Sequence, residues 1–189
     1  EAADRVMETE NRVNAMEIEI DRELSSIIAR RQPTARDLRL LIAISKTTAN
    51  LERVGDEANK IARMVKSIIE SGASRTLPSN DIRVAADMAS GLLRKALDAF
   101  ARLDTAAALS ILKDDDLIDK EFDGFVRKLV TYMMEDPRTI SASLDLLFLA
   151  KAIERIGDHA KNIAEFIIYI VKGADVRHTS MEAIESVLL

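Results

Sequence analysis

Residues 51–62 of the chain read LERVGDEANKIA, and residues 153–164 read IERIGDHAKNIA. The two segments are identical at seven of twelve positions, and four of these are not the apolar positions that any amphipathic helix would repeat. These four pairs are Glu52/Glu154, Arg53/Arg155, Gly55/Gly157 and Asp56/Asp158. The chain therefore contains an internal duplication, which predicts a fold built from two similar units.

The duplication extends upstream of this motif. Apolar residues of the preceding segment match at a constant offset of 105 positions, whereas the motif itself matches at an offset of 102. The difference of three residues falls near Pro33 and Pro137, in turns that tolerate changes of length. Each repeat therefore holds a pair of helices. The upstream matches are Val13, Ile20, Leu24 and Ile27 with Ile118, Phe125, Leu129 and Tyr132.

Apolar residues recur at helical spacing along nearly the whole chain, and no stretch alternates as a half-buried strand does. This periodicity predicts an all-α fold. The segment 71–80, rich in Ser and Gly, separates a first repeat at 1–75 from a second at 76–174 and a C-terminal tail at 175–189. We expect helices at 2–31, 34–71, 80–103, 105–135 and 138–172, and a short helix near 180–188.

The second repeat has an additional helix, at 80–103, that has no counterpart in the first. Two helices bury an apolar stripe poorly, so a third should cover it. The pattern predicts a tandem repeat of antiparallel three-helix bundles in which the first bundle lacks its N-terminal helix. We expect this helix to precede Glu1 in a longer protein, and a homodimer that covers the stripe is the alternative.

The composition excludes several classes of protein. The chain has no cysteine, so it contains no disulfide and no thiolate metal site, which fits the reducing cytoplasm. A net charge of −5 with no basic aromatic patch argues against nucleic-acid binding. The apolar run at 166–171 is far shorter than the roughly 20 residues that span a bilayer. We therefore expect a cytoplasmic protein that does not bind nucleic acid.

Acidic residues at i,i+4 form two rows in each repeat. Glu52 and Asp56 lie within roughly 40° of each other on a helix and away from its apolar seam. If the paired helices pack antiparallel, both rows of a repeat meet and offer hard oxygen ligands. Such a site suits Mg, Mn, Fe or Ca, and Zn less characteristically. The candidate metal ligands are Glu10, Asn14, Glu52 and Asp56 in the first repeat and Asp115, Asp119, Glu154 and Asp158 in the second.

Ordinary helix-surface ion pairs are the competing interpretation of the motif. Arg53 can pair with Asp56 or Glu57, Asp56 with Lys60, and Asp158 with Lys161. Gly55 and Gly157 indicate a requirement beyond surface ion pairs, since a glycine inside a helix costs roughly 1 kcal/mol relative to alanine. A tight helix crossing would explain both glycines as well as a metal would.

Catalysis has little support in the sequence. A ferritin-type di-iron site needs Glu-x-x-His, whereas Glu154 and His159 are five residues apart and Glu57 occupies the matching place in the first repeat. The chain has no P-loop and no nucleophile–base pairing. We expect no inward-facing acids and no enzymatic activity. A metal-binding or metal-storage helical bundle is the alternative function, and a purely structural dimer with surface ion pairs is a third.

The paired ERVGD and ERIGD segments closely resemble those of the PhoU family, and further stretches at 31–34, 37–40, 97–102, 131–136 and 169–173 are similar to that family. The resemblance implies two repeated three-helix bundles with surface metal sites at the eight candidate ligands, supported by the motif residues Arg53, Gly55, Arg155 and Gly157. Asn14 departs from the acidic pattern, which implies a weaker first site. It also implies a negative regulator that acts as an adaptor between the ATPase of a phosphate ABC transporter and a phosphate-sensing histidine kinase.

Overall fold

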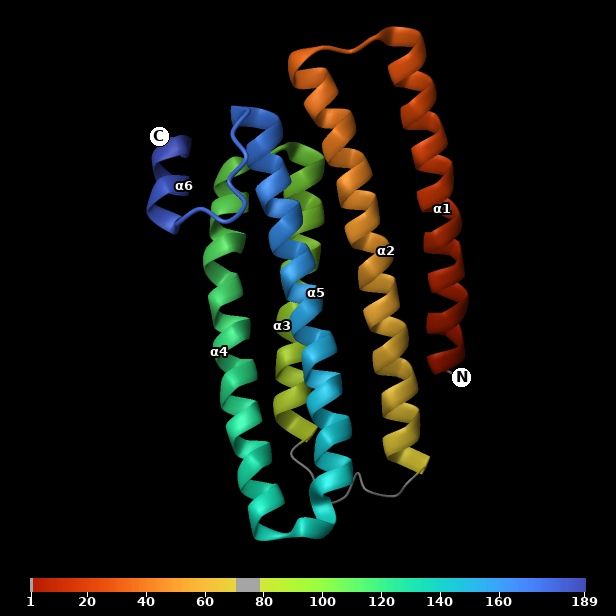
Figure 1. The fold of residues 1–189 in the computed structure, drawn as a ribbon, viewed down its shortest axis with the longest axis vertical. Coiled ribbons are helices and arrows are strands. Elements are labelled where there is room, and N and C mark those ends of the chain that lie inside the picture. Colours follow the sequence, from red (N-terminus) through yellow and green to blue (C-terminus); the bar gives the residue numbers. More distant parts are fainter. Residues whose placement is uncertain (1, 71–78) are drawn as a thin grey trace.

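Long helices make up almost all of the described part of the molecule, and successive helices run in opposite directions (Figure 1). The computed structural model describes residues 2–70 and 79–189. Its helices are α1 (Ala2–Arg31), α2 (Ala35–Glu70), α3 (Ser79–Arg102), α4 (Thr105–Glu135), α5 (Ile140–Lys172) and α6 (Met181–Leu188), with a 3₁₀ turn η2 (Pro137–Thr139) before α5. Within the described ranges no residue forms a strand, so the all-α prediction is confirmed. The expected 71–80 linker lies largely outside these ranges.

The helix ends are set by local capping. The Asp104 carboxylate accepts a hydrogen bond of 2.9 Å from the Ala107 N–H at the start of α4. Gly173 ends α5 in the left-handed conformation, with φ of 76°. The Arg39 guanidinium of α2 donates to the Ile170 carbonyl in the last turn of α5, at 3.5 Å. Arg39 thereby links the first repeat to the C-terminal end of α5, where a cation is favoured.

The central element is α5, which packs against α2, α3 and α4, while α1 contacts α2 on the far side (Figure 1). The second repeat, α3 to α5, is a three-helix bundle as predicted, and the described part of the first repeat is the pair α1 and α2. Apolar residues of α3, α4 and α5 form the main core. Its most deeply buried members include Ala96, Ala99, Ala108, Ile111, Leu129, Ile163, Ile167 and Ile168.

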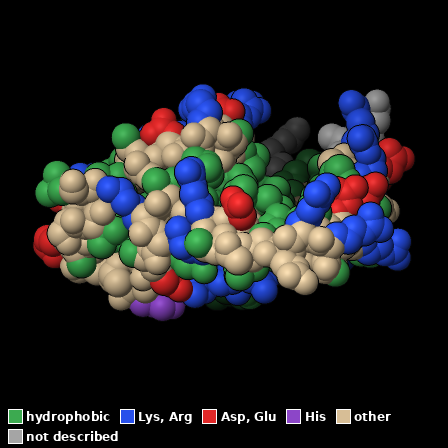
Figure 2. Space-filling model, turned by 90° about the horizontal axis from the view of Figure 1, so that it is seen from above, with side chains coloured by type: hydrophobic (Ala, Val, Ile, Leu, Met, Phe, Trp, Pro, Cys, Tyr) green, Lys and Arg blue, Asp and Glu red, His purple; other side chains and the backbone are tan. Residues whose placement is uncertain are grey.

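The outer helix α1 keeps part of its apolar surface in contact with solvent. Ile18 is 55% exposed and Met16 is 49% exposed, on opposite sides of the helix. Apolar side chains are also visible in a hollow between the helices when the molecule is viewed from above (Figure 2). Of the apolar row predicted on this helix, Leu24 is buried and Val13 and Ile20 are half-buried, so α2 covers most of the row, whereas Ile27 is 40% exposed. Over residues 2–70 and 79–189, none of the helices combines the length and apolar content that crossing a membrane requires.

Candidate functional site

In the first repeat, α1 and α2 bring acidic side chains together in what we call the first acidic cluster, formed by Glu10, Glu17, Glu52 and Asp56. Burial, followed by the negative charges of Asp56, Glu17 and Glu10, raises the pKa of Glu52. Glu10 accepts a hydrogen bond from the Asn59 side-chain amide of α2. Glu17 was not among the candidate ligands, although it continues their row on α1.

Asn14 carries an unusual feature of this first cluster. Its side-chain Oδ1 is buried and has no hydrogen-bond partner. Burying such an oxygen without a partner costs free energy, so most buried polar atoms are hydrogen-bonded. Asn14 is one turn after Glu10 on α1, at the position that Asp119 occupies on α4. The predicted ligand set of the first repeat therefore includes an amide oxygen that the protein leaves unsatisfied.

The second acidic cluster consists of Asp115 and Asp119 on α4 with Glu154 and Asp158 on α5. Burial, followed by the charges of Glu154, Asp115 and Asp119, raises the pKa of Asp158 to about 6. Burial and the charge of Asp115 likewise raise the pKa of Asp119. All four predicted residues thus lie close enough to repel one another.

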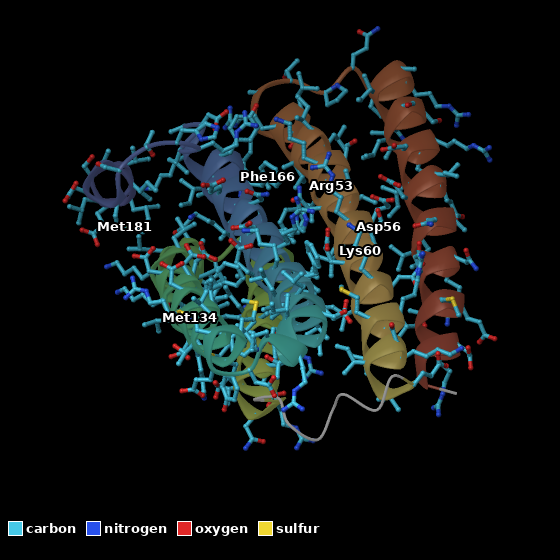
Figure 3. All side chains as sticks on the ribbon, turned by 60° about the horizontal axis from the view of Figure 1, so that its bottom comes forward. Arg53, Asp56, Lys60, Met134, Phe166 and Met181 are labelled. Carbon is cyan, nitrogen blue, oxygen red and sulfur yellow. The ribbon has the colours of Figure 1, made fainter. Side chains whose placement is uncertain are left out.

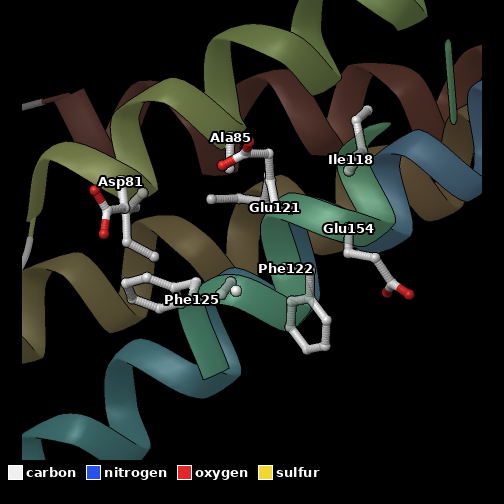
Figure 4. A pocket seen from close by; sticks show the side chains of 11 residues that line it. Asp81, Ala85, Ile118, Glu121, Phe122, Phe125 and Glu154 are labelled. Carbon is white, nitrogen blue, oxygen red and sulfur yellow. The ribbon is translucent and has the colours of Figure 1, made fainter. Parts of the chain in front are cut away.

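Two lysines of α5 partly neutralise this second cluster. Lys161 Nζ lies 2.9 Å from Asp115 Oδ2, and Lys151 Nζ lies 2.6 Å from Glu154 Oε2. A cavity of about 160 Å³ lies beside the cluster between α3, α4 and α5. Glu154 lines this cavity together with Phe122 and Phe125 (Figure 4). The second repeat therefore offsets two of its four acids with its own cations.

The structure corrects two expectations about these acids. Asp115 is only 1% exposed, so the expectation that no acid faces inward is wrong. The same-helix ion pairs proposed for Asp56 and Asp158 are also not formed, and neither carboxylate has an ion-pair partner in the described parts of the chain. Lys60 instead pairs with Glu57 at 2.8 Å, and Lys161 reaches across to α4.

The two motif glycines differ in how closely the neighbouring helix approaches. A Cβ atom on Gly157 would lie 3.2 Å from Ile118 Cδ1, which is tighter than most Cβ contacts in proteins, and 3.5 Å from Asp115 Oδ1, in ordinary contact. A Cβ on Gly55 would lie 3.9 Å from Glu10 Cγ, in normal contact. The tight-crossing interpretation therefore holds for the second repeat, where Gly157 lets α4 carry Asp115 against α5.

Between the repeats, α2 and α5 share a polar network that the sequence did not predict. Asn50 Oδ1 lies 2.8 Å from His159 Nδ1 and accepts a hydrogen bond from Asn162 at 3.0 Å. Arg155 pairs with Glu57 across the same interface, at 3.2 Å. Burial, followed by the positive charge of Arg53, lowers the pKa of His159. The signal available in the sequence was the Glu57/His159 position, where the two motifs exchange an acid for an imidazole.

The sequence is similar to those of known proteins over almost all of its length. A family model described as the PhoU domain matches residues 1–65 and 82–167. A relative from Burkholderia, described as a phosphate-specific transport system accessory protein PhoU homolog, is 56% identical and aligns with 96% of this chain and 78% of its own length. The chain belongs to the PhoU family. The accessory protein PhoU of Escherichia coli is 47% identical, with 98% of this chain and 76% of that protein aligned.

Solved PhoU structures support the same assignment. The crystal structure of PhoU from Pseudomonas aeruginosa superposes with a TM-score of 0.88 at 47% identity, over 91% of this chain and 82% of that one. The phosphate transport system regulatory protein PhoU from Streptococcus pneumoniae superposes with a TM-score of 0.83 at 25% identity, over 92% of this chain and 81% of that one. The PhoU resemblance inferred from the duplicated motif is therefore confirmed.

The PhoU resemblance implies metal ions, and the donor atoms of both acidic clusters fit a hard cation. They are carboxylate and amide oxygens with no sulfur, and Asn14 Oδ1 is a buried oxygen that lacks a partner. In the conformation described, residues 2–70 and 79–189 contain no group of three His, Asp or Glu side chains positioned to hold a metal ion. A cation at the second cluster would have to compete with Lys151 and Lys161 for the same oxygens.

Proposed function

We propose that this chain is a negative regulator of phosphate uptake and phosphate-starvation signalling. In this role it connects the ATPase of a phosphate ABC transporter to a phosphate-sensing histidine kinase in the cytoplasm. The observation that carries the proposal is membership of the PhoU family along nearly the whole chain, with relatives described as accessory proteins of phosphate-specific transport. The chain acts by binding and not by catalysis.

Exposed apolar residues on α5 support an adaptor role. Ile140, Leu144 and Phe148 recur every four residues and are 42%, 40% and 61% exposed. This spacing places them in one stripe along the helix, and such stripes often contact other proteins. The stripe is a candidate contact surface for the transporter or the kinase. The exposed apolar residues of α1 are a separate candidate surface, suited to a homodimer.

We also propose that each acidic cluster holds a hard divalent or trivalent cation such as Mg, Mn, Fe or Zn. The first site would use Glu10, Asn14, Glu52 and Asp56, and the second Asp115, Asp119, Glu154 and Asp158. Burial and then the repulsion between the acids raise the pKa of Glu52 and Asp158. A bound ion would neutralise this repulsion and would hold the two helices of each repeat together. Support comes from the clustering of these acids in both repeats and from the unsatisfied Asn14 oxygen.

Deletion of the gene tests the regulatory role. The deletion strain should express phosphate-starvation genes in phosphate-rich medium, and the reintroduced chain should restore repression. Pull-down should recover the transporter ATPase and the histidine kinase. Unchanged repression in the deletion strain, with neither partner recovered, would contradict the regulator and favour the metal-storage alternative if many ions are bound per chain.

The metal proposal is tested separately by elemental analysis of the purified chain and of a variant with Glu52, Asp56, Glu154 and Asp158 changed to Ala. We expect bound metal in the unmodified chain and none in the variant, and circular dichroism should show that the variant keeps its helices. A matched variant carries four Ala substitutions at exposed acids outside both clusters. Equal metal content in all three proteins would rule out the clusters as metal sites.

A further inference from the structure

The cavity of about 160 Å³ in the second repeat lies between the start of α3 and the middle of α4 and α5 (Figure 4). Three small residues, one from each helix, leave this space: Ala85, Gly124 and Ala150. Protein interiors rarely keep voids larger than a water molecule, because the lining atoms lose packing contacts. The space is about as large as an apolar cavity that holds one benzene molecule. Its apolar walls consist of Ile82, Ile118, Phe122, Phe125 and Ile153.

Three carboxylates line the cavity, and two of them already have a lysine as partner. Lys128 Nζ lies 2.6 Å from Asp81 Oδ2, and Lys151 Nζ lies 2.6 Å from Glu154 Oε2. Glu121 lines the cavity from an exposed position on α4, and no lysine or arginine of the described residues forms an ion pair with it. The cavity therefore has one acid whose charge is not offset, on the side that is open to solvent.

A contact at the edge of the cavity shows that an ammonium group fits these surroundings. Lys151 Nζ lies 5.1 Å from the centre of the Phe122 ring, a distance at which the π electrons of the ring attract a cation. The same Nζ is bound by Glu154. A carboxylate and an aromatic ring together thus hold an ammonium group on one side of the cavity. Glu121 supplies a further carboxylate beside the same apolar walls, without a cation of its own.

We propose that this cavity binds a small organic monocation, namely a primary amine that carries one aromatic ring or a short hydrocarbon chain. The apolar part lies between Ala85, Ala150 and the phenylalanine side chains, and the ammonium group stays at the open side, where the Glu121 carboxylate accepts its hydrogen bonds. Burial of the apolar part is favourable, and the charge keeps part of its hydration, so the large cost of desolvating an ion is avoided.

The charge and the size of the cavity define this class of ligand. Its lining in the described part of the chain includes three carboxylates and no lysine or arginine, which disfavours an anion. A neutral molecule of the same shape gains the apolar contacts but no ion pair with Glu121. A space that fits about one aromatic ring excludes molecules with two fused rings.

The cavity is separate from the wider groove of about 1150 Å³ between α2 and α5. Arg53, Asp56 and Lys60 follow one another along α2 in that groove (Figure 3), and the groove shares no lining residue with the cavity. Glu154 is the one residue of the cavity that is also a proposed metal ligand. Amine binding can be measured with purified chain freed of metal, so its failure would leave the regulatory and metal proposals untouched.

Titration of the metal-free chain with benzylamine at pH 7.5, followed by proton NMR, tests the site. The primary amine carries its proton at this pH. Benzylamine should bind saturably, with one molecule per chain and a dissociation constant of about 1 mM or below. Benzyl alcohol and benzoate have similar shapes but are neutral and anionic, and they should bind at least about fivefold more weakly because they form no ion pair with Glu121.

Glu121→Gln removes the proposed charge partner and should make benzylamine and benzyl alcohol bind with similar affinity. The matched control is Glu135→Gln, which removes the same charge from an exposed position in the last turn of α4, outside the cavity, and should keep the preference for the amine. Equal losses of benzylamine affinity in the two variants would overturn the role of Glu121.

Ala85→Leu fills the cavity from α3 and should abolish benzylamine binding, while circular dichroism and thermal unfolding confirm that the variant folds. Ala101→Leu, at an exposed position of the same helix outside the cavity, is its control and should bind as the unmodified chain does. The proposal is overturned by a benzylamine titration that does not saturate, by equal affinities for the three probes in the unmodified chain, or by unchanged binding in a folded Ala85→Leu variant.

Discussion

The two repeats make the same helix–helix contact with different chemistry. In the first, the Asn59 amide of α2 donates to Glu10 of α1, and in the second, the equivalent Lys161 of α5 forms an ion pair with the equivalent Asp115 of α4. Glu10 keeps partial access to solvent, whereas Asp115 is 1% exposed. The equivalent acid is thus deeply buried in the second repeat only, and there its partner is a lysine.

The difference follows from packing. The second repeat has α3 as its third helix and Gly157 at the crossing of α4 and α5, so α4 sits close against α5. The first repeat has two described helices and looser contact at Gly55. Burial turns a carboxylate from a tolerated surface group into one that requires a partner. The motif is therefore the same in both repeats, but its energetic consequences are not.

The largest difference should appear when each cross-helix partner is removed. Lys161→Met leaves the buried Asp115 without its cation and should lower the free energy of unfolding by about 3 kcal/mol. Asn59→Leu leaves the more accessible Glu10 and should cost about 1 kcal/mol. Urea unfolding followed by circular dichroism measures both. Equal losses in the two variants would show that the repeats are energetically equivalent at this contact.

The glycines give the next largest contrast. Gly157→Ala places a methyl group 3.2 Å from Ile118 and should destabilise the chain by about 2 kcal/mol through overpacking. Gly55→Ala has room for the methyl group and should stabilise α2 by up to about 1 kcal/mol through higher helix propensity. Thermal unfolding of the two variants gives opposite shifts. A lower melting temperature for Gly55→Ala would mean that both crossings are tight.

Much of this architecture was predictable from the sequence. Periodicity gave all five long helices to within about two residues, and Asp104 and Gly173 act as the caps that their residue types suggest. The duplicated acids were expected to meet, and each repeat brings them together. These features depend on spacing along a single helix or on antiparallel pairing of neighbours, both of which a sequence encodes directly.

The partners of the acids were not predictable in the same way. Helix arithmetic favoured Asp158 with Lys161 on one helix, yet Lys161 contacts Asp115 on another. Which of several nearby acids a lysine reaches depends on the rotation and separation of two helices, and no single-helix pattern fixes these. The network of Asn50 with His159 is likewise a product of how α2 meets α5. It was missed because the two residues belong to different repeats and lie far apart in the sequence.

The acidic clusters should also differ in their dependence on pH in protein freed of metal with a chelator. Burial, then the charge of Glu154, raises the pKa of Asp158 from 3.8 to about 6, so the folded state binds this proton more tightly than the unfolded state. Its contribution to stability is present below about pH 4 and is lost as the pH rises to about 6. Asp158→Asn should therefore raise the free energy of unfolding at pH 7.5 by about 1 kcal/mol, after allowing for solvent screening, and change it little at pH 4.

The matched variant in the first repeat is Glu52→Gln. Burial, followed by the charge of Asp56, raises the pKa of Glu52 by less than that of Asp158, so the difference between its two pH values should have the same sign and be smaller. Urea unfolding at pH 4 and pH 7.5 measures all three proteins. If Asp158→Asn shifted the free energy of unfolding equally at both pH values, ionisation of Asp158 would not be the cause of the lower stability at pH 7.5.

The smallest contrast lies between the two motif arginines. Arg155 of the second repeat forms an ion pair with Glu57 of the first. The equivalent residues in the other direction are Arg53 and His159, and there the charge of Arg53 disfavours the protonated imidazole instead of forming an ion pair. Arg155→Gln should lower the free energy of unfolding by about 0.5 kcal/mol, because its ion pair is half exposed and Lys60 still contacts Glu57. Arg53→Gln should cost nothing measurable and should raise the pKa of His159, since Arg53 is the leading charge that lowers it. Proton NMR titration of the imidazole measures that pKa, and 1 M NaCl should abolish the stability difference between the two variants. An unchanged His159 pKa in Arg53→Gln would mean that Arg53 does not face the imidazole. The contrast between Arg155, which has an ion-pair partner, and Arg53, which faces an imidazole, would then disappear.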